Sequence, residues 1–323
     1  MNTREKILKF IEQEKQISAN KIVEHFDLSR WGIYKHLNKL LEEKKIDKIG
    51  KPPKVFYILS RPIKESKEYI VDEHIKNFIE AKFLNISPNG IKTMGWNGFV
   101  LWCQKRDLDV VVSARDYVKI MEKYDSLKNN QLIDGNQKMK STFLKIFLDK
   151  IFYLDFYSIE RFGKTKLGKK LLYAKQSQDR KLIKDLSDSI KDPIKTLIKK
   201  YNIGAILFIP PTVKREIQFM RELEKSLDLN LPSIKITKVK TPIIVPQKTL
   251  SKLEDRIENA RTTFVVEESR QYSNVLLIDD AIGSGATINE IARQVRERNI
   301  SKGKIIGLAI TGSLKGFDVI SEV

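Results

Sequence analysis

The chain has 323 residues, of which 41% are hydrophobic and 31% charged, and its formal net charge is +19. Two or three domains with packed cores fit this length and apolar content, which excludes wholesale disorder. The single cysteine, Cys103, excludes a disulfide framework and any zinc site that needs paired cysteines. The apolar runs are far shorter than the ~20 residues that span a bilayer, and no apolar signal core opens the chain. A cytoplasmic protein with no membrane partner is expected.

The basic excess is unevenly spread along the chain. Residues 137–200 hold 17 basic and 7 acidic residues, and residues 1–60 hold 13 and 8. Solvated lysine faces account for part of the total, but the uneven distribution favours an anionic partner, either nucleic acid or phosphorylated metabolites. Within residues 137–200, the segment 160–176 combines lysines with two glycines. They could hold phosphates, or they could form a solvated loop and helix face.

The first sixty residues show a regular order of expected elements. Apolar spacing predicts helices over residues 3–14, 19–26 and 30–44, and then strands over 46–49 and 55–59 with a Gly/Pro turn between them. Ser29 is placed to cap the third helix. This succession of helices and a basic hairpin resembles the winged helix-turn-helix family over residues 1–60.

That resemblance implies contact with nucleic acid, and DNA is the expected partner. The recognition helix of such a domain turns its first residues toward base edges, while the hairpin touches phosphate. The residues expected to bind are Ser29, Arg30, Trp31, Tyr34, Lys35, Lys51 and Lys54. The alternative is a docking or dimerisation module in which Trp31 and Tyr34 are interface anchors.

Residues 61–140 are the least informative part and are interpreted as a small mixed bridging module. Helices are expected over 70–83 and 115–123, and residues 95–98 (GWNG) are interpreted as a break. Residues 141–157 are strongly apolar and aromatic. They are expected to pack against the next domain or to form a dimer interface.

The stretch that carries chemistry begins with buried strands. Continuous apolar runs at 203–209 and 275–278 are typical of buried parallel strands, and a further strand is expected at 263–266. The second run ends in Asp279 and Asp280, and a Gly/Ser/Thr loop, a helix over 288–298 and a strand over 304–310 follow. Strand, helix and strand in this order predict a parallel α/β sheet.

A glycine loop between a parallel strand and a helix is suited to phosphate. It exposes backbone N–H groups, and the helix adds the positive end of its dipole. The hydroxyls of Ser284 and Thr287 can donate to phosphate oxygens, and the two aspartates can accept hydrogen bonds from sugar hydroxyls. A diol next to a phosphate indicates a ribose 5-phosphate. The stretch is neither a Walker loop, because Gly-Lys-Ser/Thr is missing, nor a dinucleotide fingerprint, because the acids precede the glycines.

These thirteen residues, 275–287, resemble the phosphoribosyl diphosphate signature of type I phosphoribosyltransferases, in the ComF-like branch. The flanking residues that carry the resemblance are Pro210-Pro211, Lys214-Arg215, Thr241-Pro242, Gln247, Leu250, Arg256, Asn259-Ala260 and Phe264. The resemblance covers roughly residues 150–323. It implies an α/β fold with a type I phosphoribosyltransferase-like parallel sheet over 141–323, preceded by the bridging module and the winged helix (α+β).

By that resemblance, Asp279 and Asp280 hold the ribose hydroxyls at the catalytic centre. The 5-phosphate site is then Ile282, Gly283, Ser284, Gly285, Ala286 and Thr287, and the diphosphate loop is Pro211, Thr212, Val213, Lys214 and Arg215. Residues 239–253 are implied to be a mobile loop in which Lys248 or Lys252 meets phosphate. Magnesium is expected to arrive chelated by the diphosphate, so no metal site made by the protein alone is expected.

Two departures from the family affect function. The cysteine zinc module that often opens ComF-type chains is ruled out by the single cysteine, and Gly283 stands where some purine-salvage members carry an acid as general base. No histidine follows His74, so any proton transfer must use carboxylates, Tyr, Lys or the diphosphate. Because Gly283 replaces that acid, salvage of 6-oxopurines is not expected.

Two functions stay open. One is a metabolite-responsive DNA-binding regulator, similar in plan to the purine-operon repressor, in which the sugar-phosphate site binds phosphoribosyl diphosphate or a nucleotide. The other is an active phosphoribosyltransferase or nucleotide-cleaving effector held in a nucleoprotein assembly, similar to retron-type phage-defence systems. Either would assemble as a homodimer or in a larger complex.

Overall fold

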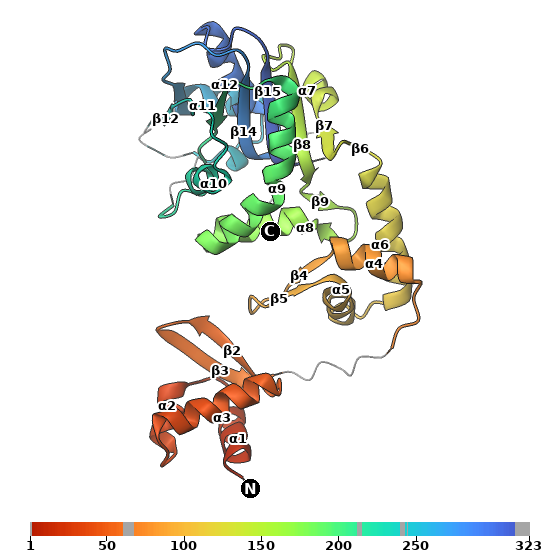
Figure 1. Ribbon diagram of the computed structural model, residues 1–323, viewed down its shortest axis with the longest axis vertical. Helices are drawn as coiled ribbons and strands as arrows, with labels where there is room; N and C mark the ends of the chain where they lie inside the picture. The colour runs from red at the N-terminus through yellow and green to blue at the C-terminus, as the bar shows by residue number, and fades with distance from the viewer. Residues whose placement is uncertain (1, 61–67, 212–214, 240–242, 244, 314–323) are drawn as a thin grey trace. The chain divides into compact units, whose positions relative to one another are not determined.

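The computed structural model describes residues 2–60, 68–211, 215–239, 243 and 245–313 (Figure 1). The chain forms two compact units, one made of residues 1–70 with 86–92 and the other of residues 71–85 with 93–323. Within the described ranges, no helix is both long and apolar enough to cross a membrane.

The N-terminal unit packs three helices on a small antiparallel sheet. The helices are α1 (Thr3–Glu14), α2 (Ala19–His25) and α3 (Arg30–Glu42), and the strands are β1 (Ile17–Ser18), β2 (Ile46–Lys51) and β3 (Lys54–Leu59) in the order β1-β3-β2. The helices and the hairpin expected from the sequence are confirmed, with α3 ending two residues early. The pairing of β1 with β3 is an addition that the sequence did not predict.

Local chemistry explains two of these boundaries. The Ser29 hydroxyl accepts a hydrogen bond from the Gly32 N–H at 3.1 Å, which caps α3 as expected. Gly50 has a φ of +84°, and a Cβ at this position would lie 2.3 Å from the Lys54 carbonyl oxygen. Because a side chain would clash there, the hairpin requires glycine at residue 50.

The segment before the main sheet is a mixed helical module. It contains α4 (Glu73–Lys82), α5 (Gly95–Gln104) and α6 (Val110–Asp125), together with the two-stranded sheet of β4 (Leu84–Ile86) and β5 (Lys92–Met94). Aromatic rings form its core, with the Phe83 and Phe99 centroids 5.0 Å apart. The break expected at residues 95–98 is wrong, because these residues form the first turn of α5.

The main sheet has six strands in the order β11-β14-β15-β8-β7-β6. The four parallel strands are β11 (Ala205–Phe208), β14 (Val275–Ile282), β15 (Ile305–Gly312) and β8 (Lys150–Phe156). They confirm the expected parallel strands in a mixed α/β fold. At the far edge β7 (Leu132–Asp134) and β6 (Lys128–Asn129) run antiparallel, so the sheet begins before residue 141, the expected start of its domain.

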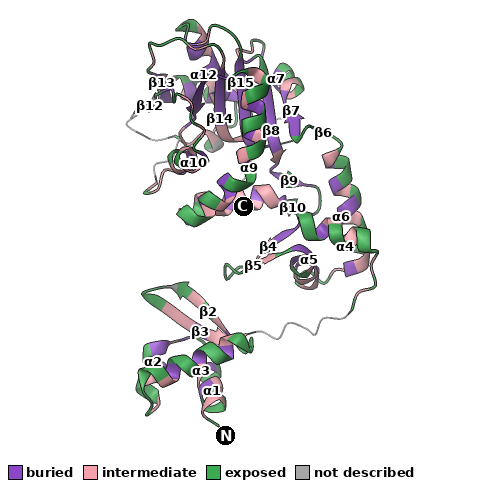
Figure 2. Cartoon of the chain, viewed as in Figure 1, coloured by how far each residue is buried: buried purple, intermediate pink, exposed green. Residues whose placement is uncertain are grey.

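Helices cover both faces of this sheet, whose central strands are buried (Figure 2). On one face α8 (Lys166–Ser177), α9 (Arg180–Tyr201) and α10 (Phe219–Leu227) share a core with the strands, for example Leu171 and Leu223 with Leu276 and Leu308. Ile288 of α12 (Ala286–Glu297) lies against the other face, where a Cβ on Gly307 would be 3.1 Å from it. α7 (Asn136–Thr142) lies close to the start of α12, because a Cβ on Gly285 would be 2.6 Å from the Met139 sulfur.

Smaller elements complete the chain. Two short antiparallel pairs lie outside the main sheet, β9 (Ser158–Ile159) with β10 (Gly163–Lys164) and β12 (Ile236–Lys238) with β13 (Phe264–Val266). Between β12 and β13 are a 3-10 turn (Gln247–Thr249) and α11 (Leu253–Thr263). The strand expected at 263–266 therefore exists, but it pairs with β12 and not with the parallel strands.

The second half of the apolar run at 141–157 forms β8. Residues 150–156 pair with β15 on one side and with β7 on the other, and most of them are buried. This packing accounts for the second half of the apolar run without a second chain, whereas Leu144 in the first half is fully exposed, and the dimer remains a prediction.

Candidate functional site

A loop at the carboxyl end of β14 opens directly into a helix. β14 ends at Ile282 and α12 begins at Ala286, which leaves Gly283, Ser284 and Gly285 between them. No side chain of the described residues caps α12, although the Ala286 N–H donates to the Ser284 hydroxyl at 3.3 Å. The first turn of the helix therefore keeps backbone donors for an anion, and the helix dipole adds positive potential there.

The two glycines of this loop have different roles. Gly285 has a φ of +86°, and a Cβ there would lie 2.6 Å from the Met139 sulfur, so glycine is required by both backbone and packing. A Cβ on Gly283 would meet nothing within 4 Å. The chain at Gly283 is thus open to a bound molecule.

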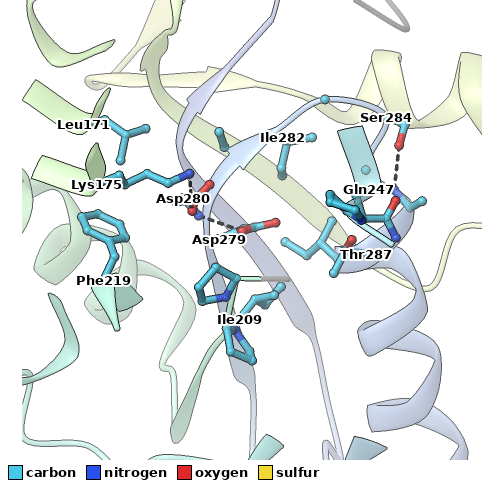
Figure 3. A pocket seen from close by; sticks show the side chains of 18 of the residues that line it. Leu171, Lys175, Ile209, Phe219, Gln247, Asp279, Asp280, Ile282, Ser284 and Thr287 are labelled. Carbon is cyan, nitrogen blue, oxygen red and sulfur yellow. Dashed lines mark hydrogen bonds and ion pairs between the residues drawn. The ribbon is translucent and has the colours of Figure 1, made fainter. Parts of the chain in front are cut away.

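Asp279 and Asp280 are the acids that precede the loop, and they point to opposite faces of β14 because successive strand residues alternate. The Asp280 carboxylate lies 2.8 Å from the Lys175 ammonium nitrogen (Figure 3). The Asp279 carboxylate accepts the Asp280 N–H at 2.8 Å. Burial raises the pKa of Asp279, and the adjacent Asp280 charge raises this pKa further against the opposing effects of that hydrogen bond and of Lys175.

These groups lie in a pocket of about 250 Å³. The whole stretch from residue 279 to residue 288 lines it. Five apolar residues of the lining, here called the apolar wall, are Tyr157, Leu171, Leu172, Ile217 and Phe219. The rest of the lining mixes apolar residues, among them Ile209, Pro246 and Phe264, with the polar side chains of Arg215, Gln247 and Arg256.

A short network holds the segment that carries Gln247 against α11. The Gln247 amide donates to the Arg256 carbonyl at 2.9 Å and to the Asn259 side chain at 3.0 Å. The Arg256 Nε donates to the Leu250 carbonyl at 2.8 Å, and burial lowers the pKa of this guanidinium. Part of the stretch predicted to be a mobile loop is therefore tied down by hydrogen bonds.

The structure brings most of the predicted C-terminal residues together. Asp279, Asp280 and the loop from Ile282 to Thr287 line the pocket, as do Pro211 and Arg215 of the predicted diphosphate loop. Thr212, Val213 and Lys214 lie outside the described residues, as does the Lys248 side chain. Lys252 is exposed at the start of α11 and does not line the pocket.

Sequence reasoning missed Lys175 and the apolar wall. Lys175 lies on α8, about a hundred positions before its partner Asp280, and no local motif joins the two. The available signal was the basic stretch at 160–176, in which this lysine was not distinguished from its neighbours. Aromatic and leucine residues such as Phe219 and Leu171 look like ordinary core from their spacing alone.

The predicted residues of α3 lie on one exposed face of the N-terminal unit. Arg30, Trp31, Tyr34 and Lys35 are all exposed, and Trp31 has 74% of its surface accessible. The Lys35 nitrogen lies 5.3 Å from the centre of the Trp31 ring. Lys54 is exposed in β3, whereas the side chain of Lys51 lies outside the described residues.

No family model matches this chain, and no curated protein does. Among solved structures, the chain is similar to a hypoxanthine phosphoribosyltransferase from Staphylococcus aureus, with a TM-score of 0.27 and 14% identity over 43% of this chain and 77% of the other. It is also similar to adenine phosphoribosyltransferases from Leishmania donovani (TM-score 0.25, 14% identity, 46% and 71% covered) and Leishmania tarentolae (0.28, 11%, 56% and 96%). Likenesses this weak carry no statement about what this chain binds.

Proposed function

We propose that residues 141–323 bind phosphoribosyl diphosphate or a nucleotide, as a type I phosphoribosyltransferase-like domain. The observation that carries this proposal is the pocket at the end of β14, where an acid pair precedes an uncapped helix N-terminus. Backbone amides suit a terminal phosphate, and carboxylates suit vicinal sugar hydroxyls. A ribose 5-phosphate offers both groups in one molecule.

The rest of the pocket suggests how such a ligand lies. The 5-phosphate binds at residues 282–287, the ribose lies over Asp279 and Asp280, and a diphosphate extends toward Pro211 and Arg215. The apolar wall is suited to a planar base. Carboxylate oxygens are donors that magnesium accepts, but the described residues hold no cluster of three or more metal-binding side chains. A magnesium ion here would therefore be bound mainly by oxygens of the diphosphate.

We further propose that the N-terminal unit is a nucleic-acid-binding winged helix, and that the whole chain is a metabolite-responsive DNA-binding regulator. The exposed Arg30, Trp31, Tyr34 and Lys35 support this, since basic and aromatic side chains on one helix face can meet phosphates and bases. The exposed Lys54 of the hairpin adds a phosphate contact.

An active enzyme is the second candidate, and the apolar wall beside Asp280 favours it because a sensor of phosphoribosyl diphosphate alone needs no base subsite. In the transferase reaction, a base nitrogen bonds to C1 of the sugar while the diphosphate leaves with the electrons of the C1–O bond, and the proton of that nitrogen passes to the departing diphosphate. Positioning and charge stabilisation can drive this step without a general base. Such an enzyme would be an effector held in a nucleoprotein assembly by its N-terminal unit.

Calorimetry with phosphoribosyl diphosphate and magnesium tests the site, with the Asp279→Asn/Asp280→Asn double variant as the comparison. Binding by the wild type and its loss in the variant would support the assignment, whereas equal affinity would end it. Incubation with phosphoribosyl diphosphate and a panel of bases, or with nucleotides alone, separates the two functions. Turnover favours the enzyme, and a ligand-dependent change in DNA affinity without turnover favours the regulator.

A further inference from the structure

Building on the proposed function, we infer that Lys175 is a positioning residue that prepares the acid pair for a polyanionic sugar phosphate. It fixes the Asp280 carboxylate and neutralises the negative charge of this carboxylate at the place where the ligand must bind. The site is thereby selective for ligands that carry phosphate on both sides of the ribose.

The ion pair is built into the pocket wall. The Lys175 nitrogen lies 2.8 Å from the Asp280 carboxylate, and the two side chains are only 19% and 13% exposed (Figure 3). Both residues line the cavity. At such low exposure, water and salt screen the charges weakly, so removing one charge changes the electrostatic energy of any ion bound nearby.

A phosphorylated ligand needs this compensation. Asp279 and Asp280 are consecutive, and both must lie near a ribose whose neighbouring groups are negatively charged phosphates. The amides of the α12 first turn contribute only partial positive charge. With Lys175 paired to Asp280, the negative charge of the Asp280 carboxylate is compensated, and its repulsion of the phosphates falls accordingly.

The helix that carries Lys175 is held at several points. The Lys166 ammonium donates to the Ala81 carbonyl at 2.7 Å, and Lys169 donates to the Leu84 carbonyl at 2.6 Å. The Arg215 guanidinium donates to the backbone carbonyl of Lys175 itself. These contacts fix α8 at both ends, so the lysine is preorganised next to Asp280.

The same contacts show what several lysines of the basic stretch at 160–176 do. Lys166 and Lys169 bond to carbonyls at the end of α4 and in β4, and Lys170 lies 3.2 Å from the Asp185 carboxylate. Lys166 and Lys169 thus hold the module of α4 to α6 against α8. From the sequence alone they looked like part of a phosphate-binding or solvated face. Lys175 is the lysine among them that lines the pocket.

The test measures binding of phosphoribosyl diphosphate, ribose 5-phosphate and uncharged ribose to Lys175→Met and Lys175→Arg. For Lys175→Met, affinity should fall at least about tenfold for phosphoribosyl diphosphate and about threefold for ribose 5-phosphate, and should be unchanged for ribose, because the penalty scales with ligand charge. Lys175→Arg keeps the positive charge and should restore affinity to within about threefold of the wild type. Lys170→Met, on the same helix but outside the pocket, is the matched control and should bind as the wild type.

The outcomes separate this inference from the function on which it rests. If the wild type binds none of the three ligands, the proposed function fails and the inference fails with it. If the wild type binds and Lys175→Met binds equally well, or loses the three ligands in equal proportion while Lys175→Arg gives no rescue, the inference alone is overturned. Thermal denaturation of every variant checks that α8 remains folded, and Lys175→Arg keeps the charge test decisive if Lys175→Met unfolds.

Discussion

Asp279→Asn should stabilise the protein while abolishing its ligand binding. Asp279 is half-buried in β14 and accepts the neighbouring N–H of Asp280, whose charge lies beside it. Burial and that charge raise the pKa of Asp279 from 3.8 to about 8. An asparagine has nearly the same shape but no charge to desolvate, so the free-energy cost of burying an ionised carboxylate is absent in the variant.

The sign and pH window of this effect follow from the direction of the shift. Below about pH 4 the carboxyl is protonated in both the folded and the unfolded chain, so the aspartate costs no stability there. As pH rises from 3.8 toward about 8, the unfolded chain ionises first, and the wild type progressively loses stability. The variant lacks this loss, so its advantage should be absent near pH 4 and largest near pH 8.

The expected size is modest. One unit of pKa shift corresponds to about 1.4 kcal/mol, but coupling to Asp280 and partial exposure reduce the realised value, so we expect about 1–3 kcal/mol at pH 8. At roughly 2–4 °C per kcal/mol for a domain of this size, calorimetric melting at pH 4, 6 and 8 can resolve the shift. Asp188→Asn, at an exposed i,i+4 pair with Lys184, is the matched control and should show no such trend.

Two results would contradict this prediction for Asp279→Asn. A variant that is less stable than the wild type at pH 8, or equally stabilised at all three pH values, would show that burial beside Asp280 does not raise the pKa of Asp279. Retained binding of phosphoribosyl diphosphate by the variant would separately remove Asp279 from the site.

Further predictions concern the loop and the N-terminal unit. Gly285→Ala should destabilise the domain by about 1–3 kcal/mol, because φ is +86° and the new Cβ meets the Met139 sulfur; melting temperature measures this loss. Gly283→Ala should melt like the wild type, since its Cβ meets nothing, yet weaken phosphoribosyl diphosphate binding by narrowing the open side of the loop; calorimetry showing full affinity would argue against a ligand there. Arg30→Ala with Lys35→Ala should weaken DNA binding and flatten its salt dependence, as measured by fluorescence anisotropy; unchanged binding would favour protein docking.

Local sequence patterns predicted several main elements of this protein. The spacing of Ile7 and Ile11, and of Ile33 and Leu37, predicted α1 and α3 because a helix repeats its buried face every three to four residues. Likewise the apolar run before Asp279 and the glycines after it predicted β14, the loop and the start of α12. A phosphate-binding loop is a local device made of neighbouring backbone groups, so its residues are contiguous and can be recognised in one dimension.

Tertiary structure alone decided which distant residues complete the site. Lys175 contacts Asp280 only because α8 packs on the face of β14 that carries Leu276, Ile278 and Asp280. No spacing rule predicts a contact between residues about a hundred positions apart. Packing likewise placed β13 against β12 and turned the glycines at 95–98 into the start of α5. Periodicity reports which face of a segment is buried, whereas the identity of the neighbour on that face depends on the path of the whole chain.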